Sequence, residues 1–465
     1  TRSDRDWSSD VCSSDLSRIY RNNGDGTFTD LQAGLAPLGS GVARWGDFNN
    51  DGRPDVLLVG EANSQGVTKL YRNAGNGAIT DVLTGLPAYL DAYCATADYN
   101  LDGWLDILRM GRVGNANSNV FAKLFRNVGN GIFQDSGAVL AGARRGFADW
   151  GDVDEDGYPD LLLGGLNANL RDMLQLYRNN GNGTFSDLSS LVPAFAPDAA
   201  LWADYDNDGR LDILIRGQKN VHFSEPSQNY SAVLRNNGTN AFSICRFSLP
   251  EISSSAGGSS DYDHDGRLEV LITGNSRSGA LLKIYENNSD ATNHAPLPPL
   301  LLSNVVSGKA ATLSWAAGSD WETPPAALAY SLRVGRLPSG FDVVCPLADT
   351  NGMRRLSDFG NLGQARTFLL TNLAPGKYYW SVQALDTTLA GSVFAPEQEF
   401  LITGPPLALT LEATGVKASA ARLNGVVDAG ALSTEAFFEW GSTTNLGMAT
   451  PGMASRGGGA VPFVV

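Results

Sequence analysis

Five nine-residue segments of the chain carry oxygen-bearing side chains at regular positions. Asp or Asn occupies positions one, three and five, Gly occupies position six, and Asp or Glu occupies position nine. Oxygen donors at alternating positions can wrap around a hard cation, the Gly permits a sharp turn, and the carbonyl of position seven can add a ligand. The five segments are Asp47 to Asp55, Asp98 to Asp106, Asp152 to Asp160, Asp204 to Asp212 and Asp261 to Glu269.

This pattern predicts up to five bound Ca²⁺ ions. Ca²⁺ accepts a set of oxygen ligands supplied by protein, whereas Mg²⁺ gives up its waters reluctantly. The closing carboxylate stands at position nine and not at position twelve as in an EF-hand, which predicts a loop between strands. The predicted ligands, with position seven contributing its carbonyl, are Asp47, Asn49, Asp51, Arg53, Asp55, Asp98, Asn100, Asp102, Trp104, Asp106, Asp152, Asp154, Asp156, Tyr158, Asp160, Asp204, Asp206, Asp208, Arg210, Asp212, Asp261, Asp263, Asp265, Arg267 and Glu269.

A simple turn is the alternative interpretation of each loop, because Asp, Asn and Gly form turns without any metal. Five copies in phase favour the metal, since converging several carboxylates is costly unless a cation compensates their charge. Loops three, four and five have four carboxylates each, and we expect them to bind most tightly. Loops one and two have Asn49 and Asn100 in place of one carboxylate, which predicts weaker sites.

The loops recur with a regular spacing that predicts the elements around them. Their first residues lie 51 to 57 residues apart, and each loop is followed by a short apolar run that ends in Gly, typical of a buried strand. A second phrase follows, as in Tyr71-Arg72-Asn73-Ala74-Gly75, whose Asn and Gly residues favour tight turns. Each unit thus predicts four strands, which is one blade of a β-propeller.

The phase of the repeat predicts a propeller that is truncated at its N-terminus, with about five visible blades plus part of another. Ile19 to Phe28 matches the last two strands of a unit, and the fifth unit has no outer strand before the linker. Residues 1–16 include DWSSDVCSSDL, which looks like a translated sequencing adapter, and we exclude them from fold reasoning.

The loop motif D-x-[DN]-x-[DN]-G-x-x-[DE] and its spacing are similar to those of the FG-GAP/VCBS repeat family over residues 17–290. These are calcium-loop propellers related to the N-terminal domain of integrin α subunits. The resemblance implies a secreted or cell-surface protein with structural calcium, and a role in adhesion or ligand binding. It names no ligand, and family members commonly have more blades than are visible here.

After a Pro-rich linker at residues 291–299, the pattern changes to short alternating strands without acidic loops. Leu373-Ala374-Pro375-Gly376-Lys377-Tyr378-Tyr379 resembles the tyrosine corner of fibronectin type III modules, in which a Tyr hydroxyl bonds back to the backbone. We therefore expect an all-β chain with a fibronectin type III-like sandwich at 300–404 and a truncated second one at 405–465. These modules are expected to act as a stalk or as generic sandwiches.

The net charge of −15 disfavours nucleic acid and anionic membranes as partners. No apolar stretch approaches the length of a membrane-spanning helix. We also expect the protein to be a monomer. Three His residues leave little material for His-based catalysis. Outside residues 1–16, Cys94, Cys245 and Cys345 are expected to be separate buried thiols, because they lack CxxC spacing.

Two classes of function remain open. The first is a non-catalytic module that binds a protein or carbohydrate ligand on the face opposite the calcium loops, around Tyr89, Asp91, Arg144 and Arg145. The second is a calcium-dependent polysaccharide lyase or another glycan-active enzyme, and a lyase needs a base and cationic groups at one site. Arg144 and Arg145 beside His222 would be candidates if the fold brings them together. Otherwise the repeated Arg72, Arg126, Arg178 and Arg235 are expected to form structural pairs.

Overall fold

The computed structural model describes residues 17–464 with short gaps. The gaps are residues 24, 76–77, 83, 115, 117–118, 130, 194–195, 220–227, 239–240, 246–248, 251–252, 277–278, 347, 350, 355–358, 418–419, 431, 441–447 and 456–459. His222 and the adapter-like segment therefore lie outside the described residues. The all-β prediction is confirmed, since the described part contains strands, one 3-10 turn (η2, Ser189–Leu191) and no α-helix. None of its helices has the length and apolarity needed to cross a bilayer.

Four sheets of four antiparallel strands follow one another along the chain, and a three-stranded sheet follows them. They are β3 (Ser40–Gly46), β4 (Asp55–Ala62), β5 (Gln65–Gly75) and β6 (Ala78–Val82); β7 (Leu90–Ala97), β8 (Asp106–Arg112), β9 (Val120–Asn127) and β10 (Phe133–Asp135); β11 (Arg144–Gly151), β12 (Asp160–Leu166), β13 (Asp172–Asn179) and β14 (Phe185–Asp187); β15 (Ala196–Ala203), β16 (Asp212–Lys219), β17 (Gln228–Asn236) and β18 (Phe242–Cys245); and β19 (Ser253–Ser260), β20 (Glu269–Ser276) and β21 (Gly279–Tyr285). A hairpin of β1 (Tyr20–Asn22) and β2 (Phe28–Asp30) precedes them.

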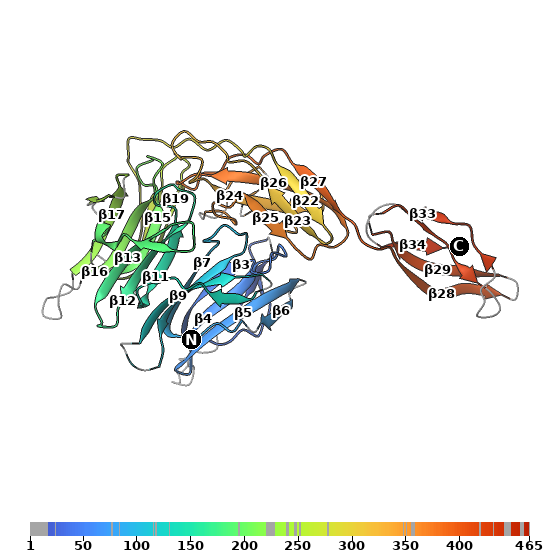
Figure 1. Ribbon diagram of the computed structural model, residues 1–465, viewed down its shortest axis with the longest axis horizontal. Helices are drawn as coiled ribbons and strands as arrows, with labels where there is room; N and C mark the ends of the chain where they lie inside the picture. The colour runs from blue at the N-terminus through green and yellow to red at the C-terminus, as the bar shows by residue number, and fades with distance from the viewer. Residues whose placement is uncertain are drawn as a thin grey trace, which may run out of the picture.

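These sheets are the predicted blades, and they are arranged around an arc (Figure 1). The first strand of each blade contacts the first strand of the next, so β3, β7, β11, β15 and β19 line the inner side. The second strand of each of the first four blades is largely buried, as for Leu57 and Ile107 at 0% exposure, whereas β20 of the fifth blade is partly exposed, with Leu271 at 39%. Continuous apolar runs are expected where both faces of a blade are packed.

Apolar side chains at position two of the loops fill the spaces between neighbouring blades. Phe48, Tyr99, Val153 and Tyr205 are all buried and anchor the loops to the blades. Tyr262 differs from them, since it is 52% exposed. The physical reason is its place on the fifth blade, against which no further sheet packs in the described part of the chain.

Two sandwich-like units follow the propeller (Figure 1). The first pairs β22 (Ser303–Ser307), β23 (Ala310–Ser314) and β25 (Thr367–Leu370) in one sheet, and β24 (Ala329–Gly335), β26 (Gly376–Leu385) and β27 (Gln398–Ile402) in another. The second contains β28 (Leu407–Lys417), β29 (Ala420–Asp428) and β34 (Ala460–Val464), with the pairs β30 (Thr434–Ala436) and β33 (Met453–Ser455), and β31 (Glu439–Trp440) and β32 (Met448–Ala449). It lies apart from the propeller in Figure 1.

The first sandwich has a large aromatic core. Trp315, Tyr330 and Trp380 pack together at its centre. The Tyr378 hydroxyl donates to the carbonyl of Ala374 at 2.8 Å, which is the contact expected of the tyrosine corner. The domain boundaries and the fibronectin type III assignment remain predictions.

One expectation from the sequence needs correction. Cys94 is buried, but Cys245 is half-buried and Cys345 is exposed, so the three separate thiols are not all buried. Cys345 is exposed because it lies in the irregular segment between β24 and β25. The first sandwich lies directly against the propeller, and its role as a stalk or as a generic sandwich remains a prediction. Thr371 and Thr387 both bond to propeller loops.

Candidate metal sites in five loops

The five acidic segments join the first and second strands of the blades, and they adopt one conformation. Position four has a positive φ in each, from 52 to 63°, at Asn50, Leu101, Glu155, Asn207 and His264. Position six is Gly in every loop, with φ between +83 and +91°. Side chains other than Gly rarely adopt that conformation. The repeated sequence therefore produces five equivalent turns at one end of the propeller.

The position-one carboxylate organises each turn. In the first loop, Asp47 accepts the N–H of Asp51 at 3.1 Å and the N–H of Gly52 at 2.7 Å. The same pair of contacts occurs in the other four loops, at Asp98, Asp152, Asp204 and Asp261. These hydrogen bonds hold the following backbone in a curve.

The position-nine carboxylate joins the loop to the third strand of its blade. Asp160 accepts the N–H of Asn179 at 2.7 Å and the N–H of Val153 at 2.9 Å. Asp212 makes the equivalent contacts with Asn236 and Tyr205. A side chain placed at this position is therefore fixed by backbone groups from two directions.

Three of the loops bring carboxylates together closely enough to hold a metal ion. The clusters combine Asp152, Asp154 and Asp160; Asp204, Asp206 and Asp212; and Asp261, Asp263 and Asp265, with one oxygen of each residue within 4.8 Å of the others. These are the three loops with Asp at position three. In the first two loops an amide stands there, and Asn49 and Asn100 donate to the position-five carboxylates at 3.1 and 3.0 Å.

Burial shapes the electrostatics of the loops. Burial raises the pKa of Asp47 and Asp98 to about 7, and that of Asp106, Asp152 and Asp212 to about 8. Neighbouring carboxylates in the same loop push these pKa values in the same direction. The loops thus concentrate carboxylates in surroundings that disfavour their charge, which a bound cation would offset.

The repeated arginines of the third strands partly neutralise these carboxylates. Arg178 pairs with Asp154 and, at 3.0 Å, with Asp156. Arg126 pairs with Asp102 at 2.7 Å, and Arg235 pairs with Asp206 and Asp208. The expected structural pairing is therefore observed for Arg126, Arg178 and Arg235, and their partners are the loops themselves.

The donor set fits a hard divalent cation. Each of the first four loops holds one buried carboxylate oxygen without a hydrogen-bond partner among the described residues, on Asp55, Asp106, Asp154 and Asp206. Such an oxygen is costly to bury unless a cation or another donor satisfies it. Oxygen ligands without nitrogen or sulfur match the preferences of Ca²⁺ or Mg²⁺. The Asp, Asn and Glu side chains named above would hold such an ion.

A repeated Asn links each loop to the next blade, and sequence reasoning missed this role. Asn127 donates its side-chain amide to the carbonyl of Phe48 at 2.9 Å, and Asn179 donates to Tyr99 at 2.7 Å. Asn236 and Asn287 repeat the contact in the following blades. The recurring Arg-Asn phrase contained the signal, but its partner is a backbone carbonyl, which no sequence pattern marks.

The opposite face of the propeller holds a different cluster. Asp91, at the start of β7, accepts hydrogen bonds from Arg112 at 2.6 Å, Arg145 at 2.8 Å and Arg144. Burial alone would raise the pKa of Asp91, but the three arginines outweigh it and lower the pKa to about 2. Glu61 accepts the backbone N–H of Asp91. Three arginines thus face two carboxylates, and the Arg145 side chain is 63% exposed.

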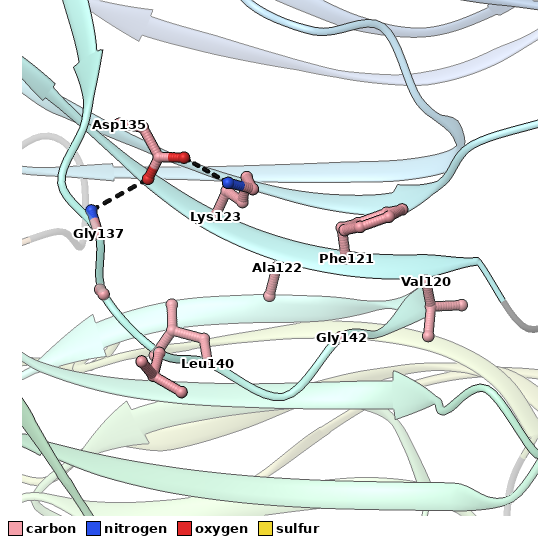
Figure 2. Close-up of a pocket in the computed structure, with 10 residues that line it drawn as sticks. Val120, Phe121, Ala122, Lys123, Asp135, Gly137, Leu140 and Gly142 are labelled. Atoms are coloured by element: carbon pink, nitrogen blue, oxygen red, sulfur yellow. Dashed lines mark hydrogen bonds and ion pairs between the residues drawn. The ribbon is translucent and has the colours of Figure 1, made fainter.

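A nearby hollow of about 270 Å³ offers no comparable chemistry (Figure 2). Its lining includes Phe121 and Leu140, and its charged groups, Lys123 and Asp135, pair with each other. Asp135 also accepts the N–H of Gly137 at 3.0 Å. The hollow therefore presents neither a free base nor a free cation.

Comparisons with known proteins agree with the repeat. The model of the FG-GAP-like repeat matches residues 4–58, 47–109 and 152–215, which include the first four loops. The chain therefore carries repeats of the FG-GAP family. It is also 27% identical over 186 residues to cartilage acidic protein 1 of Mus musculus and of Homo sapiens. The match covers 37% of this chain and 28% and 27% of those proteins, so the chain spans about a quarter of their length.

Proposed function

We propose that this chain is part of an extracellular calcium-binding propeller that binds a protein or carbohydrate ligand without catalysis. Calcium in the five loops stabilises one end of the blades, and the ligand binds at the opposite end. The observation that carries the proposal is the contrast between the two ends. Carboxylates gather in the loops, where the chain's own sandwich lies, while Arg145 is exposed at the other end.

The arginine cluster favours an acidic ligand. Guanidinium groups bind carboxylate and sulfate-like groups through paired hydrogen bonds. Ion pairs with Asp91 fix Arg112 and Arg144 in place. These two guanidinium groups therefore form a rigid, positively charged surface next to Arg145. The FG-GAP-like repeats and the similarity to cartilage acidic protein 1 support the extracellular setting.

Binding of the full chain to an array of acidic and neutral glycans and extracellular proteins tests this function. We expect binding to acidic ligands, weakened at least about tenfold by Arg145→Ala, the loss expected for one charged hydrogen bond. Arg336→Ala is the matched control, because Arg336 has the same 63% side-chain exposure but lies in the sandwich. Release of an unsaturated sugar from an acidic polysaccharide would instead establish the lyase, and the absence of any bound ligand would contradict the proposal.

A further inference from the structure

The first sandwich makes direct hydrogen bonds to two of the acidic loops. Thr371 donates its backbone N–H to the carbonyl of Asn50 in the first loop at 2.7 Å, and its hydroxyl to the carbonyl of Asn49 at 3.1 Å. Thr387 donates its hydroxyl to the carboxylate of Asp204, position one of the fourth loop, at 3.0 Å. The sandwich therefore contacts both backbone and a predicted metal ligand.

The Gly at position six shows how closely the sandwich and its linker approach each loop. A Cβ on Gly52 would overlap the carbonyl of Val343, and one on Gly209 would overlap the carbonyl of Glu322. The approach is looser at the third and fifth loops, where a Cβ on Gly157 would lie 3.4 Å from the Ala326 carbonyl and one on Gly266 would lie 3.3 Å from that of Asn293. Gly103 of the second loop differs, because a Cβ there would meet nothing within 4 Å.

Docking of the sandwich covers the position-one carboxylate of the fourth loop. Asp204 is 0% exposed, and the Thr387 side chain that bonds it is itself buried. Removing several carboxylates from water is costly without a compensating positive charge, and Arg235 reaches only Asp206 and Asp208. A divalent ion within the loop would supply that charge, so the docked state and the metal-loaded state favour each other.

We propose that the sandwich of residues 300–404 is a metal-dependent lid on the loop face of the propeller, with Thr387 positioning Asp204 in the fourth loop. The proposal rests on the proposed calcium sites. Coupling of this kind is reciprocal, so calcium strengthens docking and docking strengthens calcium binding to the same degree. Thr387 acts through the orientation of a ligand, as hydrogen-bond donors to metal-binding carboxylates do.

Hydrogen exchange of the full chain, with calcium and with chelator, tests the lid. The N–H of Thr371 reports docking, because its partner is the Asn50 carbonyl across the interface. We expect its exchange to accelerate at least about tenfold when calcium is removed, since chelation releases the lid. Gly209→Ala should give the fast rate even in calcium. Gly103→Ala is the matched control, since Gly103 and Gly209 share φ values of +85 and +86° but only Gly209 meets the sandwich.

Calorimetric titration with calcium separates the lid from the metal sites. Thr387→Val keeps the shape of the side chain and is expected to weaken one calcium site about tenfold or more, while leaving the other sites unchanged. If calcium binds but the Thr371 N–H exchanges at the same rate in calcium and in chelator, the lid would be contradicted and the metal sites would still be supported. A titration without any calcium binding would overturn both. Equal exchange rates in Gly209→Ala and Gly103→Ala would also contradict the lid.

Discussion

The two faces of the propeller are built in different ways. The loop face repeats one turn five times and lies against the first sandwich. Hydrogen bonds from backbone N–H groups fix its carboxylates. The opposite face holds a cluster that occurs once among the described residues, assembled around Asp91 by arginines of β8 and β11, with Arg145 exposed. Repetition of a group in every blade indicates a structural role. A group found once, at an accessible end, is better suited to selecting a ligand.

Asp91→Asn should have the largest effect on stability, because it removes the shared partner of three arginines. Breaking a buried ion pair by removing one partner costs about 3 to 5 kcal/mol, and the Asp91 side chain is 10% exposed. The loss should be the same with and without calcium, since the cluster lies at the end away from the loops. Chemical denaturation with and without calcium measures this loss of stability. A loss that appears only in calcium would contradict the conclusion that the two faces are independent.

Asp212→Asn should cost less, and its cost should depend on calcium. In chelator the loss should be small, because burial raises the pKa of Asp212 to about 8 and its carboxyl is already neutral in the metal-free protein at neutral pH. In calcium the variant should lose a further increment, because the fourth loop no longer closes around the ion. Denaturation with calcium and with chelator measures both parts. Equal losses under the two conditions would argue against a metal in this loop.

A comparison of Asn236→Ala with Asn73→Ala measures how much the repeated Asn contact between blades stabilises the loop face. Both amides cap the turn that follows, but Asn236 also bonds the carbonyl of Val153 in the preceding blade, at 2.9 Å. In the described part of the chain, Asn73 bonds only its own blade, at the carbonyl of Pro54. We expect Asn236→Ala to cost about 1 to 2 kcal/mol more, as measured by thermal unfolding. Similar losses for the two variants would show that the contact between blades contributes little.

Much of the loop face could be predicted from the sequence, because each loop depends on residues close together in the chain. The spacing of Asp47, Gly52 and Asp55 within nine residues was enough to place the turn and the strands on either side. The pairing of the repeated arginines was also expected, since they stand on equivalent strands.

The remaining features depend on residues that are far apart. Thr387 and Asp204 are separated by 183 positions, and neither belongs to a motif that marks the contact. Arg144 and Arg145 were expected near the opposite face, but their convergence on Asp91 requires two blades to be placed side by side. Packing between blades, and between the propeller and the sandwich, determines such contacts. The sequence pattern within one blade carries no information about this packing.

The pH dependence of stability follows from the carboxylates of the loop face. Burial raises the pKa of Asp152 and Asp212 to about 8, well above the usual value of 3.8. Without metal, the folded protein therefore holds protons that the unfolded chain releases. This contribution to stability is full below pH 4 and is lost as the pH rises toward 8. Calcium binds the deprotonated groups, so its stabilising effect should grow over the same range.

Thermal unfolding of the full chain in calcium and in chelator, at pH 5 and at pH 8, tests the central claim most directly. Each occupied site adds about 2.7 kcal/mol at a calcium concentration 100 times its Kd. We therefore predict that calcium raises the Tm by more than about 5 °C at pH 8, and by less at pH 5. A Tm that is the same in calcium and in chelator at both pH values would contradict the account.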